Sequence, residues 1–110
     1  MNEGERRAAR WYRLRGWRVL AANVRVGRDE LDLIVRRGRA LRFVEVKEKG
    51  GDGYGQPLEM IDARKIDHVE RAALRWLQAH PDLRGLDVGF DAVGVSGARL
   101  ERVPLERWDG

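Results

Sequence analysis

The chain has 110 residues, the size of one ordinary domain, and 43% of them are hydrophobic, which is enough to build a core. It contains no cysteine, which excludes disulfides, thiolate zinc sites and a cysteine nucleophile. No apolar run approaches the roughly 18 residues of a membrane span, and the charged N-terminus lacks the pattern of a signal peptide. We therefore expect a single domain over residues 1–110, located in the cytoplasm and not in a membrane.

Charge is unevenly distributed along the chain. Residues 1–42 carry 12 basic and 5 acidic groups, a net charge of +7, whereas residues 43–110 carry 10 basic and 13 acidic groups, a net charge of −3. A phosphate-binding surface would produce this basic first half, but so would solvated arginines on helices and turns. Only three of the 22 basic residues are lysines, so Lys47 departs from the chain's preference for arginine.

A helix is predicted from about Glu3 to Arg15, with Gly16 ending it. Asn2 fits the N-cap position, and Glu5 follows three residues later as its capping-box partner. A glutamate on the inward side of a purely structural helix is unusual. At helical spacing, that inward stripe contains Glu5, Ala8, Ala9 and Tyr12.

The next segments have the composition of β-strands. Residues 17–26 predict one strand, and residues 30–47 predict a hairpin that turns at Gly38. Strict alternation separates the first arm of this hairpin into two faces. Glu30, Asp32 and Ile34 are expected on one face, and Leu31, Leu33 and Val35 on the other.

The hairpin also gathers charged side chains. In its second arm, Glu45 and Lys47 share a face with Phe43. A short turn pairs Asp32 with either Phe43 or Glu45. Because cross-strand neighbours lie within ~5–8 Å, both registers leave Asp32, Glu45 and Lys47 together on one face.

The second half of the chain predicts a glycine-rich loop, a helix and two strands. The loop covers residues 48–57, the helix residues 58–80, and the strands residues 86–95 and 98–105. The resulting order is α-β-β-β-α-β-β. A helix between the third and fourth strands favours a crossover connection, so we expect an α/β fold with a central mixed sheet flanked by helices.

The charged residues of the hairpin are typical of a metal site. Converging carboxylates from Asp32, Glu45 and Glu5 would repel one another unless a cation joined them. Oxygen ligands without thiolates favour Mg²⁺ or Mn²⁺, and a lysine beside the ion could orient a water or a phosphate oxygen. Hydrolysis of a phosphodiester is the reaction that these groups suit. The alternatives are a solvated ion pair of Glu45 with Lys47, a capping role alone for Glu5, and an edge charge for Glu30.

At this point the sequence resembles a known superfamily. "ELDLIV" at 30–35 followed by "FVEVK" at 43–47 is similar to the Asp…Glu-x-Lys signature of the PD-(D/E)XK, or restriction-endonuclease-like, nucleases. Within it, the chain resembles the YraN-type family of small bacterial endonuclease-like proteins, related to Holliday junction resolvases. The matching positions are Gly4-Glu5, Gly16, Asn23, Arg25, residues 30–34, residues 43–47, Gly55, Lys65 and "FDAV" at 90–93.

This resemblance implies a restriction-endonuclease-like core with the order α-β-β-β-α-β. It implies metal binding by Asp32, Glu45 and the carbonyl of Val46, with Glu5 completing the acidic cluster. Lys47 would then position the water or the phosphate. The implied activity is a Mg²⁺- or Mn²⁺-dependent endonuclease acting on DNA, with branched or recombination-intermediate DNA as the implied substrate.

The chain departs from the family pattern at three positions, and none of them is an expected ligand. Asp29 stands where glycine is usual, whereas Lys49 and Gly89 stand where arginine is usual. These changes affect expected contacts with the substrate.

Contacts with nucleic acid are expected mainly from cations. A tyrosine in the glycine-rich loop could stack on a base, and a homodimer would allow two strands to be cut. The alternative functions are a non-catalytic nucleic-acid-binding module on the nuclease scaffold and a protein–protein adaptor. The candidate nucleic-acid-binding residues are Arg6, Arg10, Arg13, Lys49, Tyr54 and Lys65.

Overall fold

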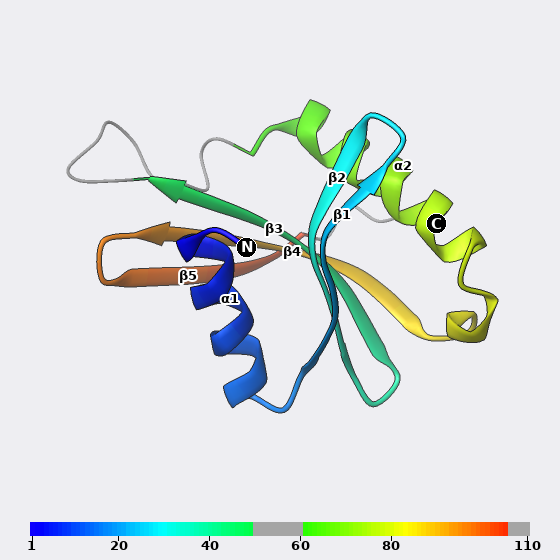
Figure 1. Ribbon diagram of the computed structural model, residues 1–110, viewed down its shortest axis with the longest axis horizontal. Coiled ribbons are helices and arrows are strands. Elements are labelled where there is room, and N and C mark those ends of the chain that lie inside the picture. Colours follow the sequence, from blue (N-terminus) through cyan, green and yellow to red (C-terminus); the bar gives the residue numbers. More distant parts are fainter. Residues whose placement is uncertain (50–60, 106–110) are drawn as a thin grey trace.

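The structure is a computed structural model that describes residues 1–49 and 61–105. Two α-helices, five β-strands and one short 3₁₀ helix follow one another in the predicted order (Figure 1). The elements are α1 (Glu3–Leu14), β1 (Arg18–Val26), β2 (Asp29–Arg37), β3 (Ala40–Lys49), α2 (Ala63–Gln78), η2 (Pro81–Leu83), β4 (Asp87–Ser96) and β5 (Arg99–Leu105).

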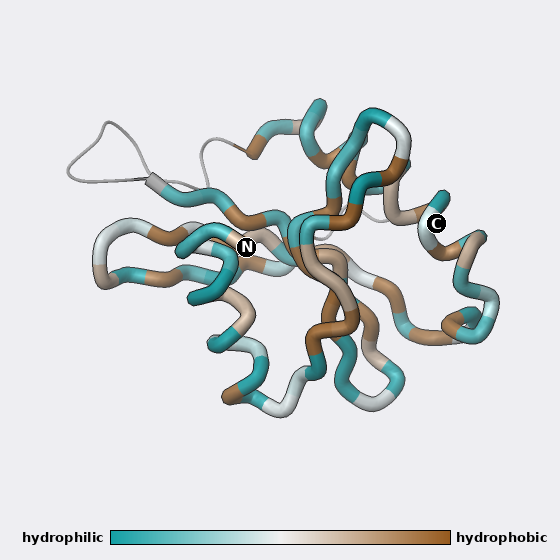
Figure 2. The backbone as a smooth tube through the Cα atoms, viewed as in Figure 1, coloured by the Kyte–Doolittle hydropathy of each residue, from teal (hydrophilic) through white to brown (hydrophobic). Residues whose placement is uncertain are grey.

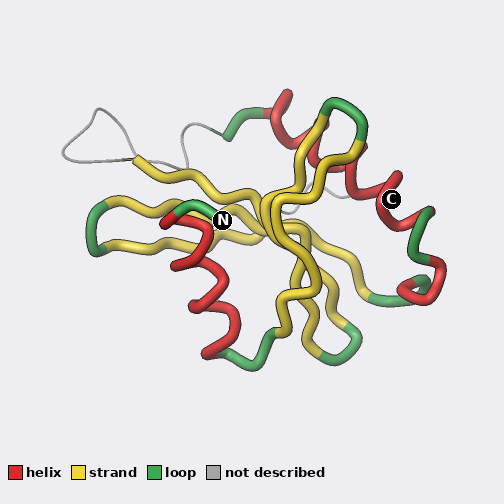
Figure 3. The backbone as a smooth tube through the Cα atoms, in the orientation of Figure 1, coloured by secondary structure: helices red, strands yellow, loops and turns green. Residues whose placement is uncertain are grey.

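The five strands form one sheet in the order β1-β2-β3-β4-β5. Neighbouring strands are antiparallel except β3 and β4, which are parallel and are connected through α2. The helices lie on different sides of the strands (Figure 3). The predicted α/β fold with a mixed sheet flanked by helices is therefore confirmed, and it is consistent with a restriction-endonuclease-like core.

Helix α1 begins and packs as its sequence predicts. Asn2 and Glu5 form a complete capping box, with the Glu5 amide donating to Asn2 Oδ1 at 2.8 Å and the Asn2 amide donating to Glu5 Oε1 at 2.9 Å. Gly4 allows a close approach to β3, since a Cβ at this position would lie 3.1 Å from Glu48. The predicted inward stripe is buried throughout: Glu5, Ala8, Ala9 and Tyr12.

The sheet separates two hydrophobic cores, one under each helix. Hydrophobic residues lie along the strands, while the turns are mostly hydrophilic (Figure 2). Burial of this apolar surface on both faces is the main stabilising contribution to such a layered fold. The α1 side contains Ala8, Ala9, Tyr12, Trp17, Leu33, Val35, Val44, Val46, Val93 and Val95. The α2 side contains Leu31, Ile34, Leu41, Phe43, Val69, Ala72, Ala73, Trp76, Leu83 and Phe90.

A buried polar group anchors α1 to the far half of the sheet. The Tyr12 hydroxyl donates to Asp91 Oδ2 at 2.6 Å, and Arg102 Nε donates to the same oxygen at 3.2 Å. Burial, and then the negative charge of Asp91, raise the pKa of Tyr12 well above its usual value. Asp91 is thus a buried carboxylate paired with a cation and satisfied by hydrogen bonds.

Helix α2 starts later than predicted. Its N-cap is Asp62, whose side chain accepts a hydrogen bond from the Lys65 amide at 2.9 Å, so Ile61 and Asp62 precede the helix. An aspartate at this position satisfies a free amide of the first turn, which explains why the helix begins here. In the described parts of the chain, neither helix has the length and hydrophobicity needed to span a membrane.

Candidate metal centre

The candidate site lies where strands β2 and β3 separate. The described pairing of these strands ends at Leu33 opposite Val44, and one further step in the same register would place Asp32 opposite Glu45. Instead of continuing the ladder, Asp32 Oδ2 accepts a hydrogen bond from the Val46 amide at 2.9 Å. Beyond this point the tip of β1 and β2 turns toward α2, while β3 continues beside β4 (Figure 1).

The predicted alternation of β2 is wrong at this position. Leu33 packs in the core under α1, but Leu31 packs with Ile34 in the core under α2. The regular two-residue period therefore breaks around Asp32. On the neighbouring strand β1, Asn23 has a left-handed φ of 50°. It lies between Ala22, which pairs with Leu33, and Val24, which pairs with Leu31. Asparagine tolerates this conformation better than most residues, and the local twist lets side chains change faces.

Three carboxylates meet on the α1 side of the break. One oxygen each from Glu5, Glu30 and Asp32 lie within 4.8 Å of one another. The Asn23 side-chain amide lies between two of them, donating to Glu5 Oε2 at 2.9 Å and to Glu30 Oε1 at 3.3 Å. Glu5 is only 6% exposed, and both of its carboxylate oxygens have partners. Its Oε2 accepts from Asn23, and its Oε1 accepts from the Asn2 amide in the capping box. Glu30, for which the sequence favoured an edge charge, belongs to this group.

Glu45 approaches the same point from the α2 side and is 4% exposed. Its Oε1 lies 3.4 Å from Lys65 Nζ and 4.0 Å from Lys47 Nζ. Asp32 links the two sides. Its charge raises the pKa of Glu45, and the charge of Glu5 raises the pKa of Asp32. The structure thus brings Glu5, Asp32, Glu45 and Lys47 into one region and adds Glu30 and Lys65.

Burial raises the pKa of two carboxyl groups of the site, Asp32 and Glu45. Burial raises the pKa of Asp32, and the charge of Glu5 raises it further, against the lowering effect of the Val46 amide. Burial and the charge of Asp32 raise the pKa of Glu45 to about 7, although the ammonium groups of Lys65 and Lys47 act in the opposite direction. Both shifts indicate uncompensated negative charge in a partly dry environment.

The donor set fits a hard divalent cation. Four carboxylates (Glu5, Glu30, Asp32 and Glu45) oppose two ammonium groups (Lys47 and Lys65), so full ionisation gives −4 + 2 = −2, the charge that one divalent ion neutralises. Oxygen donors are the ligands that Mg²⁺ and Mn²⁺ prefer. At Val46 the structure shows the amide acting through Asp32; a ligand role for its carbonyl stays a prediction.

Manganese binding is expected to strengthen between about pH 5.5 and 7.5, by up to about tenfold per pH unit for each proton released. The reason is that Glu45, with its pKa near 7, must lose its proton before it can bind an ion. The stability of the metal-free protein should change in the opposite direction. Folded Glu45 holds its proton more tightly than unfolded Glu45, so the free energy of unfolding falls as pH rises from 4.5 to about 7.

Titration calorimetry with Mn²⁺ at constant ionic strength, and urea unfolding in chelator at the same pH values, measure these two opposite trends. A metal affinity that is independent of pH over this range would contradict the assignment of Glu45 to the site.

The cations expected to contact nucleic acid are distributed over both helices. Arg6, Arg10 and Arg13 are exposed on α1, where Arg6 also donates to the Met1 carbonyl at 2.6 Å. Lys65 lies in the first turn of α2 and pairs with Glu45, a contact that its position 20 residues away gave no reason to expect. The side chain of Lys49 and the whole of Tyr54 lie outside the described residues.

Asn23 is the other site residue that sequence reasoning did not single out for a role. Besides its match to the family pattern, its signal is chemical, because an asparagine inside a strand-like run is unusual and marks a position that can adopt positive φ. Which carboxylates its amide would contact depends on the strand geometry.

The fold and this site define a class of protein: an α/β domain with a restriction-endonuclease-like core and a cluster of carboxylates where two central strands separate. Residues 4–95 match the model of Uncharacterised protein family UPF0102, the YraN family, and the chain belongs to this family. The predicted family resemblance is therefore confirmed.

Several bacterial proteins named only as UPF0102 proteins are similar over most of their length. The protein from Beutenbergia cavernae is 37% identical over 107 residues, covering 97% of this chain and 90% of the relative. The protein from Frankia casuarinae is 42% identical over 107 residues with the same coverage. The protein from Dinoroseobacter shibae is 41% identical over 99 residues, covering 90% of this chain and 72% of the relative.

Two departures from the family pattern have partners within the fold. Asp29 accepts hydrogen bonds from Arg71 Nε and Nη2 at 3.2 Å, which ties the β1–β2 turn to α2. Gly89 lies opposite Arg42, and a Cβ at position 89 would lie 2.9 Å from the Arg42 Nε. An arginine from the adjacent strand therefore occupies the space over Gly89.

Proposed function

We propose that this protein is a Mg²⁺- or Mn²⁺-dependent endonuclease that hydrolyses phosphodiester bonds in DNA, with branched DNA as its substrate class. The observation that carries this proposal is the meeting of Glu5, Glu30 and Asp32 within 4.8 Å beside a buried Glu45. This combination of carboxylates and lysine side chains suits phosphodiester hydrolysis more than simple binding. A site for binding alone would not gain from excess negative charge, because that charge would repel DNA unless a cation were present.

The proposed role of each residue follows from its position in the site. Asp32 would be the central ligand, held in place by the Val46 amide, with Glu45 on one side and Glu5 and Glu30 on the other. A bound divalent cation would supply Lewis-acid stabilisation of the phosphate oxygens. Lys47 is 29% exposed in its side chain and lies at the rim of the site, where its ammonium group could orient the attacking water or hold a phosphate oxygen.

The Asn23 amide has a positioning role in this arrangement. By donating to both Glu5 and Glu30, it holds two carboxylates of like charge at a fixed separation before an ion arrives. Pre-organisation of this kind reduces the cost of ordering ligands upon metal binding.

The test is incubation of the purified protein with branched and linear DNA in Mg²⁺, in Mn²⁺ and in chelator. We expect cleavage with either ion and none in chelator, and stronger cleavage of the branched substrate. DNA binding without cleavage under any ion would instead support a non-catalytic binding module on the same scaffold. An Asp32→Asn sample purified in parallel controls for a contaminating nuclease.

A further inference from the structure

One side of α2 carries a row of three arginines and a histidine. The contacts of this row show that it faces the β1–β2 turn: His68 Nδ1 lies 3.6 Å from Asp29 Oδ1, and a Cβ on Gly27 would lie 2.7 Å from Arg75 Nη1. At 1.5 Å per residue the row is about 16 Å long, enough to follow several backbone phosphates of one strand. The row consists of Arg64, His68, Arg71 and Arg75, spaced by four, three and four residues so that they share one side of the helix.

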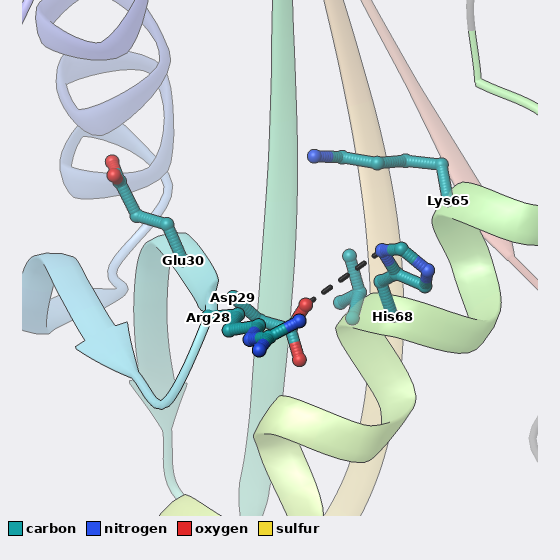
Figure 4. Close-up of a pocket in the computed structure, with 6 residues that line it drawn as sticks. Arg28, Asp29, Glu30, Lys65 and His68 are labelled. Carbon is teal, nitrogen blue, oxygen red and sulfur yellow. Dashed lines mark ion pairs between the residues drawn. The ribbon is translucent and has the colours of Figure 1, made fainter.

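A pocket of about 190 Å³ lies between this row and the β1–β2 turn. In Figure 4, Lys65 and His68 extend into the space from α2, opposite Arg28 and Asp29 of the turn. Lys65 connects the pocket to the metal centre, because its Nζ lies 3.4 Å from Glu45 Oε1. A ligand in this pocket would therefore lie beside the metal centre, next to the phosphate that reacts there, without occupying the metal centre itself.

The acidic residues of the pocket are engaged elsewhere. Asp29 is paired with Arg71 and also lies 3.6 Å from His68 of the pocket, and its side chain is only 10% exposed. The carboxylate of Glu30 points toward α1 (Figure 4), where Asn23 holds it in the acidic group. The charge that a ligand would meet is accordingly that of Arg28 and Lys65, with His68 as a further hydrogen-bond donor.

We propose that the pocket and the α2 row bind backbone phosphates of the DNA strand, with the phosphate next to the reacting one held by Arg28, Lys65 and His68. This inference rests on the proposed function, since it takes DNA as the ligand. Contacts of cations with phosphates are independent of base sequence and fix the register of the strand over the metal centre. The substrate strand would then run along α2.

The arginines of α1 offer a less suitable surface. Arg6 is engaged with the Met1 carbonyl and with Glu3, and Arg7 donates to the Gly97 carbonyl. The hollow beside Arg10 exposes mainly apolar surface, from Trp11, Leu14 and Leu100, between the side chains of Arg7, Arg10 and Arg15. These contacts favour a structural and solvated role for much of this surface.

The experiment measures binding of a short fluorescein-labelled DNA, single-stranded and duplex, by anisotropy in chelator over a series of salt concentrations. Arg28→Ala/Arg64→Ala removes two exposed arginines from the proposed surface, and Arg10→Ala/Arg13→Ala removes two exposed arginines from α1. We expect the first pair to weaken binding about tenfold and to reduce the salt slope by about two, and the second pair to change affinity by less than about twofold.

Equal losses for the two pairs, a larger loss for the α1 pair, or no DNA binding by the wild-type protein would overturn this inference. Because the measurement needs neither metal nor cleavage, it is separable from the proposed function. Weaker DNA binding by the Arg28→Ala/Arg64→Ala variant, together with no cleavage by the wild-type protein in any ion, would overturn the nuclease proposal alone. Ion-dependent cleavage with an unaffected Arg28→Ala/Arg64→Ala variant would overturn the phosphate path alone.

Discussion

Asp32→Asn is expected to abolish divalent-ion binding while making the metal-free protein more stable. The substitution should weaken Mn²⁺ binding at least about 100-fold and reduce cleavage by about 10³-fold or more, because the central ligand loses its charge. It should also raise the free energy of unfolding at neutral pH. The reason is that burial and the charge of Glu5 make the Asp32 carboxylate unfavourable, whereas an asparagine oxygen can still accept from the Val46 amide.

Calorimetric titration with Mn²⁺ and urea unfolding in chelator measure the two effects of this substitution. Asp82→Asn, which removes an exposed carboxylate from η2, serves as the matched control and should change neither quantity. An Asp32→Asn protein that binds Mn²⁺ normally and unfolds more readily would show that Asp32 is a structural residue and not a ligand.

Lys47→Ala is expected to lower the rate of DNA cleavage by about 10²- to 10³-fold while leaving Mn²⁺ affinity within a few-fold of wild type. Lys47 lies 4.0 Å from Glu45 and is partly exposed, so it can reach a water or phosphate beside the ion without being needed to hold the ion. Lys47→Arg should not restore the rate, because a planar guanidinium cannot replace a compact ammonium at a defined point.

Single-turnover cleavage together with calorimetric Mn²⁺ titration separates these roles. Lys65→Ala is the informative comparison, since it removes the other ammonium group that pairs with Glu45, at 3.4 Å. A loss of cleavage for Lys65→Ala that exceeds the loss for Lys47→Ala would transfer the water- or phosphate-orienting role to Lys65.

Local sequence patterns were sufficient to predict most of the fold. The capping box of Asn2 and Glu5 and the inward stripe of α1 depend on residues three and four apart, which interact within one helix wherever that helix packs. The hairpin at Gly38 and the mixed sheet follow in the same way from strand periodicity and from the helix between β3 and β4. The predicted start of α2 at residue 58 is wrong, because the side chain of Asp62 caps the first turn and the helix begins at Ala63.

The candidate site was predictable in its chemistry but only partly in its membership. Asp32, Glu45 and Lys47 stand out because charges within a strand of β-formers need a reason. Strict alternation places Glu30 on the face of Asp32, but periodicity alone does not distinguish a ligand from an edge charge. The contacts of Asn23 depend on the break at Asp32, which alternation does not foresee. Lys65 belongs to another element, and only the position of α2 brings its ammonium group to Glu45.

The sequence by itself determined the order of elements, the family, and the presence of acidic and basic residues within strands of β-forming residues. Tertiary structure decided which of them meet. Residues 5, 23, 30, 32, 45 and 65 belong to five elements, and their separations depend on strand divergence and helix placement. Those distances arise from packing between elements that are far apart in the chain. In such packing, a one-residue change in strand register moves a side chain to the opposite face of the sheet. Helix capping and periodicity, in contrast, depend only on residues that are close neighbours in the chain.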